Sequence, residues 1–129
     1  MTVINEDLLA YLRLPGPCDF CGKMASVRQP HHLRSRGMGG GSRLDIPINL
    51  AALHPECHCH VQGNRLRETI CLQMVADRLG IGIGRIVFIR DQLLRLPKDT
   101  TEDELEELGL LRWVIWKKPA PEADGSLPF

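Results

Sequence analysis

Apolar residues recur at helical intervals in several segments of the chain. In residues 65–79, apolar positions follow one another every three or four residues up to Gly80, as one face of an amphipathic helix requires. Thr101 followed by Glu104 is a capping-box pattern, which predicts the start of a short acidic helix. Residues 86–89 fit either a helix or a strand. The helices predicted in this way span residues 5–14, 65–79, 85–96 and 101–109.

The middle of the chain lacks this period and predicts short strands. Residues 24–30 and 49–53 are each compatible with a strand. Residues 33–47 between them are rich in glycine and arginine, a composition typical of a loop. Pro55 suits the first turn of a helix that would end near Gln62. A strand, loop, strand and helix with further helices on both sides predict an α+β fold.

The same pattern predicts how the chain is organised. Residues 1–64 are expected to form a small core with a flanking N-terminal helix, and residues 65–116 a helical extension packed on that core. Residues 117–129 hold three prolines and little that could be buried, so we expect a disordered tail. The whole is one domain, or a small module with an extension.

Composition argues against a membrane or secreted protein. The longest apolar run, residues 86–89, is far too short to span a bilayer. Residues 1–14 include Asn5, Glu6 and Asp7 where a signal peptide would need an apolar core. We therefore expect a cytoplasmic protein that does not contact a membrane.

Cysteine and histidine occur in two short hooks. Cys18 and Cys21 are separated by two residues, and His54 and Cys57 have the same spacing. Tetrahedral Zn²⁺ takes four nitrogen or sulfur ligands, which two such hooks supply. The sequence therefore predicts a structural zinc site that contributes directly to the stability of a small fold.

Two alternatives to this ligand set are compatible with the spacing. Cys59 could replace Cys57, or His58 could replace His54. A CxxC motif in a reducing compartment also occurs at redox sites. The redox interpretation expects a thioredoxin-like βαβ pattern after the motif, and a glycine- and histidine-rich segment follows instead. A metal site is therefore favoured.

The residues between and after the hooks resemble a known nuclease family. His31 to Gly40, then Ile48 to Leu53, then Cys57-His58 resemble HNH nucleases, in particular phage and bacterial members with two zinc knuckles. The resemblance covers roughly residues 18–62. It implies a ββα-metal core, in which a β-hairpin and a helix hold one catalytic ion. It also implies a DNA endonuclease or nickase that hydrolyses phosphodiester bonds.

The resemblance implies a role for each residue that matches the motif. His32 would be the general base that takes a proton from water, and Asn49 would hold the loop and strand that orient it. His31 would bind the catalytic ion, where many relatives have Asp. His58 would be a second ligand, and Gln62 occupies the position of a third. Gln is a poor ligand for a soft or borderline metal.

Histidine and a divalent ion suit this chemistry. Histidine, with an unperturbed pKa of ~6.5, can generate a nucleophile near neutral pH. A divalent ion such as Mg²⁺ or Mn²⁺ would stabilise the charge that develops at the scissile phosphate.

DNA would be the partner of the basic segment, residues 22–44. The formal net charge is zero, yet residues 22–44 contain no acid and residues 99–107 contain no base. Arg34, Arg36 and Arg43 would bind phosphates beside the histidine pair. The alternative is a solvated loop with ordinary surface charge.

Two other functions remain open from the sequence. The chain could be a zinc-stabilised DNA-binding module without catalysis, an alternative motivated by the poor ligand Gln62. It could also be a scaffolding protein that docks a partner, or a second copy of itself, through the C-terminal helices. The pairing of a base at His32 with a ligand at His58 favours the enzyme, because a binding module needs neither.

Overall fold

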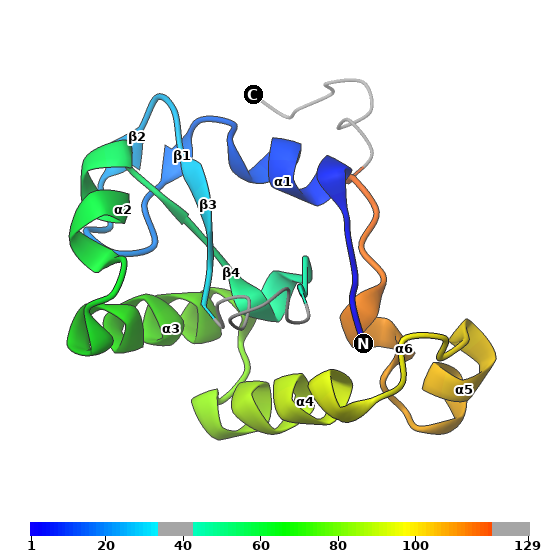
Figure 1. The fold of residues 1–129 in the computed structure, drawn as a ribbon. Helices are drawn as coiled ribbons and strands as arrows, with labels where there is room; N and C mark the ends of the chain where they lie inside the picture. Colours follow the sequence, from blue (N-terminus) through cyan, green and yellow to red (C-terminus); the bar gives the residue numbers. More distant parts are fainter. Residues whose placement is uncertain (34–42, 120–129) are drawn as a thin grey trace.

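A computed structural model describes residues 1–33 and 43–119 (Figure 1). Two of the predicted phosphate contacts, Arg34 and Arg36, lie outside the described residues, as does most of the predicted tail. In chain order the elements are α1 (Glu6–Leu12), β1 (Gly16–Pro17), β2 (Met24–Ala25), β3 (Gln29–His32), the 3₁₀ helix η1 (Pro47–Asn49), β4 (Leu50–Leu53), α2 (Pro55–Val61), α3 (Arg65–Leu79), α4 (Ile83–Arg95), α5 (Glu102–Glu107) and α6 (Leu111–Val114).

The predicted α+β class is confirmed. Two small antiparallel sheets are present in the described residues, one formed by β1 and β2 and the other by β3 and β4. In the second sheet His31 is opposite Ala51 and His32 is opposite Leu50. The helix α2 follows β4 after one residue, so the order hairpin then helix is that of a ββα unit.

One predicted strand is divided in two. Residues 24–30 were expected to be continuous, but β2 pairs with β1 whereas β3 pairs with β4. Arg28 lies at the break, where its guanidinium donates to the carbonyls of Leu14 and Pro17. Its backbone N–H donates to the carbonyl of Arg13. These bonds hold Arg28 against the end of α1, so the chain changes partner strand there.

The predicted helices form where their end signals occur. Asn5 accepts a hydrogen bond from the N–H of Leu8 and caps α1. Gly80 ends α3 in the left-handed region with φ 68°, which glycine adopts without steric cost. Thr101 and Glu104 form the full capping box of α5. Residues 86–89 are helical within α4, where Ile86 and Ile89 continue a helical stripe into the core.

The apolar core joins residues of the N-terminal and C-terminal halves of the chain. A smaller cluster gathers residues of the first cysteine hook, β4, α2 and α3. These are Cys18, Ala51, Leu53, Val61, Cys71 and Val75. A larger cluster packs residues before and within η1 against α4 and α5, and includes Leu44, Ile46, Ile48, Ile86, Ile89, Leu93 and Leu105. Burial of each such side chain contributes about 1.5–3 kcal/mol, so the helices after residue 64 help to hold the hairpin in place.

The hairpin of β3 and β4 lies between helices. Figure 1 shows α3 running along one side of the hairpin and α1 on the other, with α2 at its end. Contacts of α3 with β4 and α2, and of α1 with β3, fix this arrangement. No helix in the described part of the chain is long and apolar enough to cross a membrane.

Candidate functional site

The two predicted hooks meet at one end of the hairpin. The turn between β1 and β2 carries Cys18 and Cys21, and the junction of β4 with α2 carries His54 and Cys57. Their four ligand atoms all lie within 4.8 Å of one another. The Cys21 sulfur and His54 Nδ1 are 3.3 Å apart, close to the distance of about 3.5 Å between S and N ligands of tetrahedral zinc. The cluster could therefore bind a metal such as zinc.

The alternative ligands do not belong to this cluster. Cys59 is exposed and is not a member of the cluster, and the Nδ1 atom of His58 is hydrogen-bonded to Gln29 instead. The structure therefore selects His54 and Cys57 for the second hook, as first predicted.

The charge state of the two inner thiols fits a cation. Burial raises the pKa of the Cys18 thiol, but N–H donors from the backbone outweigh burial and lower this pKa to about 6. Burial and the neighbouring sulfurs of Cys18 and Cys21 raise the pKa of Cys57 to about 12. The first thiolate thus forms easily and opposes a second, and a divalent cation would relieve that repulsion.

The first hook is anchored to the rest of the fold by Asp19. Its backbone N–H donates to the carbonyl of Ala52, and its carboxylate accepts from the N–H of Ala52. The guanidinium of Arg78 in α3 donates to the same carboxylate at 3.1 and 3.3 Å. Gly22 completes the turn with φ 77°, a conformation that strains other residues. The cluster of Cys18, Cys21, His54 and Cys57 is therefore connected to both β4 and α3.

The second predicted site lies at the other end of β3. His31 is only 7 % exposed, and its Nε2 atom lies 2.5 Å from Oε1 of Glu68 in α3. The rings of His31 and His58 are in edge contact, with centroids 5.1 Å apart. The Nδ1 atom of His58 is 2.8 Å from the side-chain oxygen Oε1 of Gln29, so Nδ1 donates and Nε2 keeps a lone pair. Burial and His31 lower the pKa of His58, which favours the neutral form that binds metals.

His32 faces a different partner from its neighbour. Its Nε2 atom is 2.7 Å from Oδ1 of Asp45, which is fully buried. Burial raises the pKa of Asp45, but hydrogen bonds from Arg43 and His32 outweigh it and lower that pKa. Asp45 is therefore an ionised acceptor at neutral pH. Because Nε2–H donates to it, Nδ1 is the nitrogen of His32 that can accept a proton.

Asn49 lies where the loop returns to the hairpin. Its buried side-chain amide donates to the carbonyl of Leu44 at 3.0 Å, and its backbone carbonyl accepts from Leu33 at 2.8 Å. These bonds join the segment before η1 to the residue after β3. The geometry is compatible with the predicted role of Asn49 in holding the loop beside His32.

His31, His32 and His58 share one pocket with a volume of about 500 Å³. Gln62 also lines it, while its backbone N–H closes the last turn of α2 on the carbonyl of His58. Glu68 completes the lining and was not singled out from the sequence. Its position in the first turn of α3 was predictable, but its proximity to His31 depends on how α3 packs along the hairpin. The lining residues are Pro30, His31, His32, His58, Gln62, Gly63 and Glu68.

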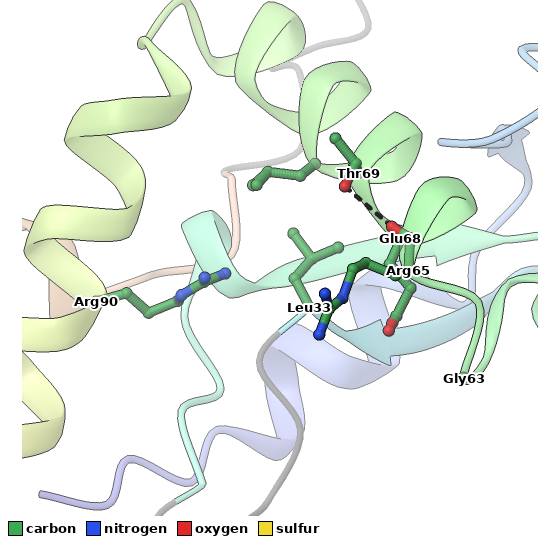
Figure 2. A pocket seen from close by; sticks show the side chains of 7 residues that line it. Leu33, Gly63, Arg65, Glu68, Thr69 and Arg90 are labelled. Carbon is green, nitrogen blue, oxygen red and sulfur yellow. Dashed lines mark hydrogen bonds between the residues drawn. The ribbon is translucent and has the colours of Figure 1, made fainter.

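A second cavity of about 480 Å³ adjoins this pocket and shares Gly63 and Glu68 with it. Figure 2 shows Arg65, Glu68 and Thr69 on the first turns of α3, with Arg90 reaching toward them from α4. Neither Arg65 nor Arg90 belongs to a sequence motif, so neither could be singled out from the sequence.

Arg43 is engaged within the protein. Its guanidinium donates to Asp45 at 2.9 and 2.6 Å and to Glu6 at 3.3 Å. These contacts raise the pKa of Arg43, chiefly through the bonds to Asp45. Contact of Arg43 with DNA stays a prediction, and its observed partners give it a structural role next to His32.

The two candidate sites differ in how closely their ligands gather. Among residues 1–33 and 43–119, the cluster of Cys18, Cys21, His54 and Cys57 is the one group of three or more His, Cys, Asp or Glu residues whose ligand atoms all lie within 4.8 Å of one another. His31, His58 and Glu68 share a pocket without being gathered so tightly.

Comparisons of this chain with protein-family models, curated proteins and solved structures found no match.

Proposed function

We propose that the protein is a metal-dependent DNA endonuclease or nickase of the HNH type, stabilised by a structural zinc ion. The observation that carries the proposal is the pair of adjacent histidines at the end of β3. His31 faces His58 and a carboxylate, whereas His32 is oriented by the buried Asp45. One pocket thus holds candidate metal ligands beside a candidate base.

The structural zinc ion would be held by the cysteine cluster. Three sulfurs and one imidazole are a ligand set typical of closed zinc sites. The cluster lies where β4 meets α2, whereas His31 and His32 lie toward the other end of β3, so zinc would fix the strands that carry them without taking part in hydrolysis.

The reaction would begin at His32. Its Nδ1 atom takes a proton from water, and the ionised Asp45 stabilises the imidazolium that forms. Asp45 also fixes the ring orientation, with Arg43 holding the carboxylate in turn. A Mg²⁺ or Mn²⁺ ion at His31 and His58 would supply positive charge to the phosphate and the leaving oxygen. General-base help of this kind typically gives about 10²–10⁴ in rate.

The proposal is tested with zinc-loaded protein, supercoiled plasmid DNA and either Mg²⁺ or Mn²⁺. We expect conversion to nicked or linear DNA, inhibition by excess chelator, and loss of cleavage in His58→Ala. The matched control is His60→Ala, because His60 is exposed on the same helix and does not line the pocket. Binding of DNA without cleavage under every divalent metal would instead support the zinc-stabilised binding module.

A further inference from the structure

We propose that Glu68 of α3 is the third protein ligand of the catalytic divalent cation, together with His31 of β3 and His58 of α2. This inference rests on the proposed function and completes its ion site. The motif placed only the amide of Gln62 at that position. The carboxylate that approaches the pocket comes instead from a helix outside the ββα unit.

The contact between Glu68 and His31 joins distant parts of the chain. The two residues are separated by 37 positions, and Oε1 lies 2.5 Å from Nε2. The His31 side chain is 9 % exposed and the Glu68 side chain is 31 % exposed. The carboxylate therefore has one side against the buried imidazole and another toward the open pocket, where water and a phosphate can reach it.

The distance between Glu68 and His31 leaves little movement for these two ligands to bind one ion, whereas His58 would have to move closer to them. Two atoms that each bind an ion at about 2.1 Å are about 3–3.4 Å apart at the usual angles. Oε1 of Glu68 and Nε2 of His31 therefore need to separate by less than about 1 Å. A metal ion between these two atoms would replace their hydrogen bond. The half-buried carboxylate belongs to α3, so it can make this movement without disturbing the hairpin.

The third ligand atom is the Nε2 atom of His58. The Nδ1 atom of this ring donates to Gln29 on β3, so the ring is held with Nε2 available. The His31 ring lies beside it, with centroids 5.1 Å apart. The hairpin, the ββα helix and the following helix would thus each give one ligand.

The ligand set also indicates which metal would be preferred. Two imidazoles and one carboxylate suit transition metals, whereas Mg²⁺ prefers oxygen ligands and water. We therefore expect Mn²⁺ to bind this site more tightly than Mg²⁺. A glutamine at position 62 contributes at most a weak neutral oxygen, so its removal should have little effect.

The test measures Mn²⁺ binding to zinc-loaded protein by loss of the electron paramagnetic resonance signal of free Mn²⁺. Wild type should bind one ion in addition to its zinc. Glu68→Gln keeps the shape but removes the charge, and should weaken binding at least tenfold. Glu56→Gln makes the same chemical change on α2 away from the pocket, and Gln62→Ala removes the competing candidate. Both should bind within about twofold of wild type.

A thermal readout separates metal binding from a purely structural ion pair between Glu68 and His31. Melting temperatures of wild type and Glu68→Gln are compared with and without Mn²⁺. A ligand role predicts that Mn²⁺ raises the melting temperature of wild type but not of Glu68→Gln. An equal increase in both proteins would overturn the assignment, whatever the variant does to stability without metal.

The outcomes distinguish this inference from the proposed function. If Glu68→Gln binds Mn²⁺ as tightly as wild type, Glu68 is not a ligand and the nuclease proposal stands. If Mn²⁺ binds through Glu68 but wild type leaves DNA intact, the ligand assignment stands and the nuclease proposal fails. A zinc-loaded wild type that binds no second ion contradicts both.

Discussion

Asp45 is a buried carboxylate that accepts hydrogen bonds from His32, Arg43 and Asn5. We predict that Asp45→Asn is strongly destabilising, because it disrupts these bonds. Oδ1 accepts from Nε2 of His32 and Nε of Arg43. Oδ2 accepts from Nη2 of Arg43 and the N–H of Asn5. An asparagine amide converts one of these acceptors into a donor. Whichever way the amide is oriented, its NH₂ group faces two donors.

The size of the effect follows from burial. The Asp45 side chain is fully buried and that of Arg43 is 19 % exposed. Removal of one partner of a buried ion pair costs about 3–5 kcal/mol. Arg43 stays partly exposed to solvent and also contacts Glu6. We therefore expect Asp45→Asn to lower the free energy of unfolding by about 3 kcal/mol. For a chain of this size that corresponds to a decrease in melting temperature of about 10 °C.

Urea unfolding of zinc-loaded protein at pH 7, followed by circular dichroism, measures this difference. The matched control is Asp99→Asn, since Asp99 is exposed and its replacement should change the free energy of unfolding by less than about 0.5 kcal/mol. A loss below about 1 kcal/mol for Asp45→Asn would refute the reasoning, because it would mean that Arg43 and His32 do not depend on the carboxylate.

Three further predictions concern zinc, acid and the loop. Cys18→Ser should lose the zinc ion and unfold, whereas Cys59→Ser should keep both zinc and fold; metal analysis and circular dichroism check this, and a folded, zinc-free Cys18→Ser protein would disprove the site. The lowered pKa of Asp45 means that its contribution is present above the unfolded pKa of ~3.9 and is lost as pH falls further. The free energy of unfolding should therefore fall between pH 5 and pH 2.5, and it should fall less in Asp45→Asn than in wild type. Asn49→Ala should lose about 1–3 kcal/mol in denaturant unfolding, and unchanged stability would show that the Leu44 bond is dispensable.

Local features of the fold could be predicted because their causes are local. Asn5, Gly80 and the Thr101 box set helix ends through hydrogen bonds and backbone angles within a few residues. The cysteine hooks were predictable for a related reason. A spacing of two residues brings Cys18 and Cys21 into one turn, and the preference of zinc for four such ligands implies that a second hook lies nearby.

The remaining features depend on contacts between distant segments. Arg28 interrupts a predicted strand because it bonds to carbonyls 11 to 15 positions earlier. Asp45 meets His32 across the loop, and Glu68 meets His31 only because α3 packs along the hairpin. No periodicity or motif in the sequence specifies these pairs. The acidic partners of both histidines were therefore missed, although the histidines themselves were predicted.

The central claim is that His32 acts as the base in metal-dependent hydrolysis of DNA. The most direct measurement is the single-turnover rate of plasmid nicking by zinc-loaded wild type and His32→Ala with Mg²⁺ or Mn²⁺. We predict a rate loss of at least ~10² in the variant, with zinc content and circular dichroism unchanged. Equal rates in the two proteins, including no cleavage by either under any divalent metal, would contradict the claim.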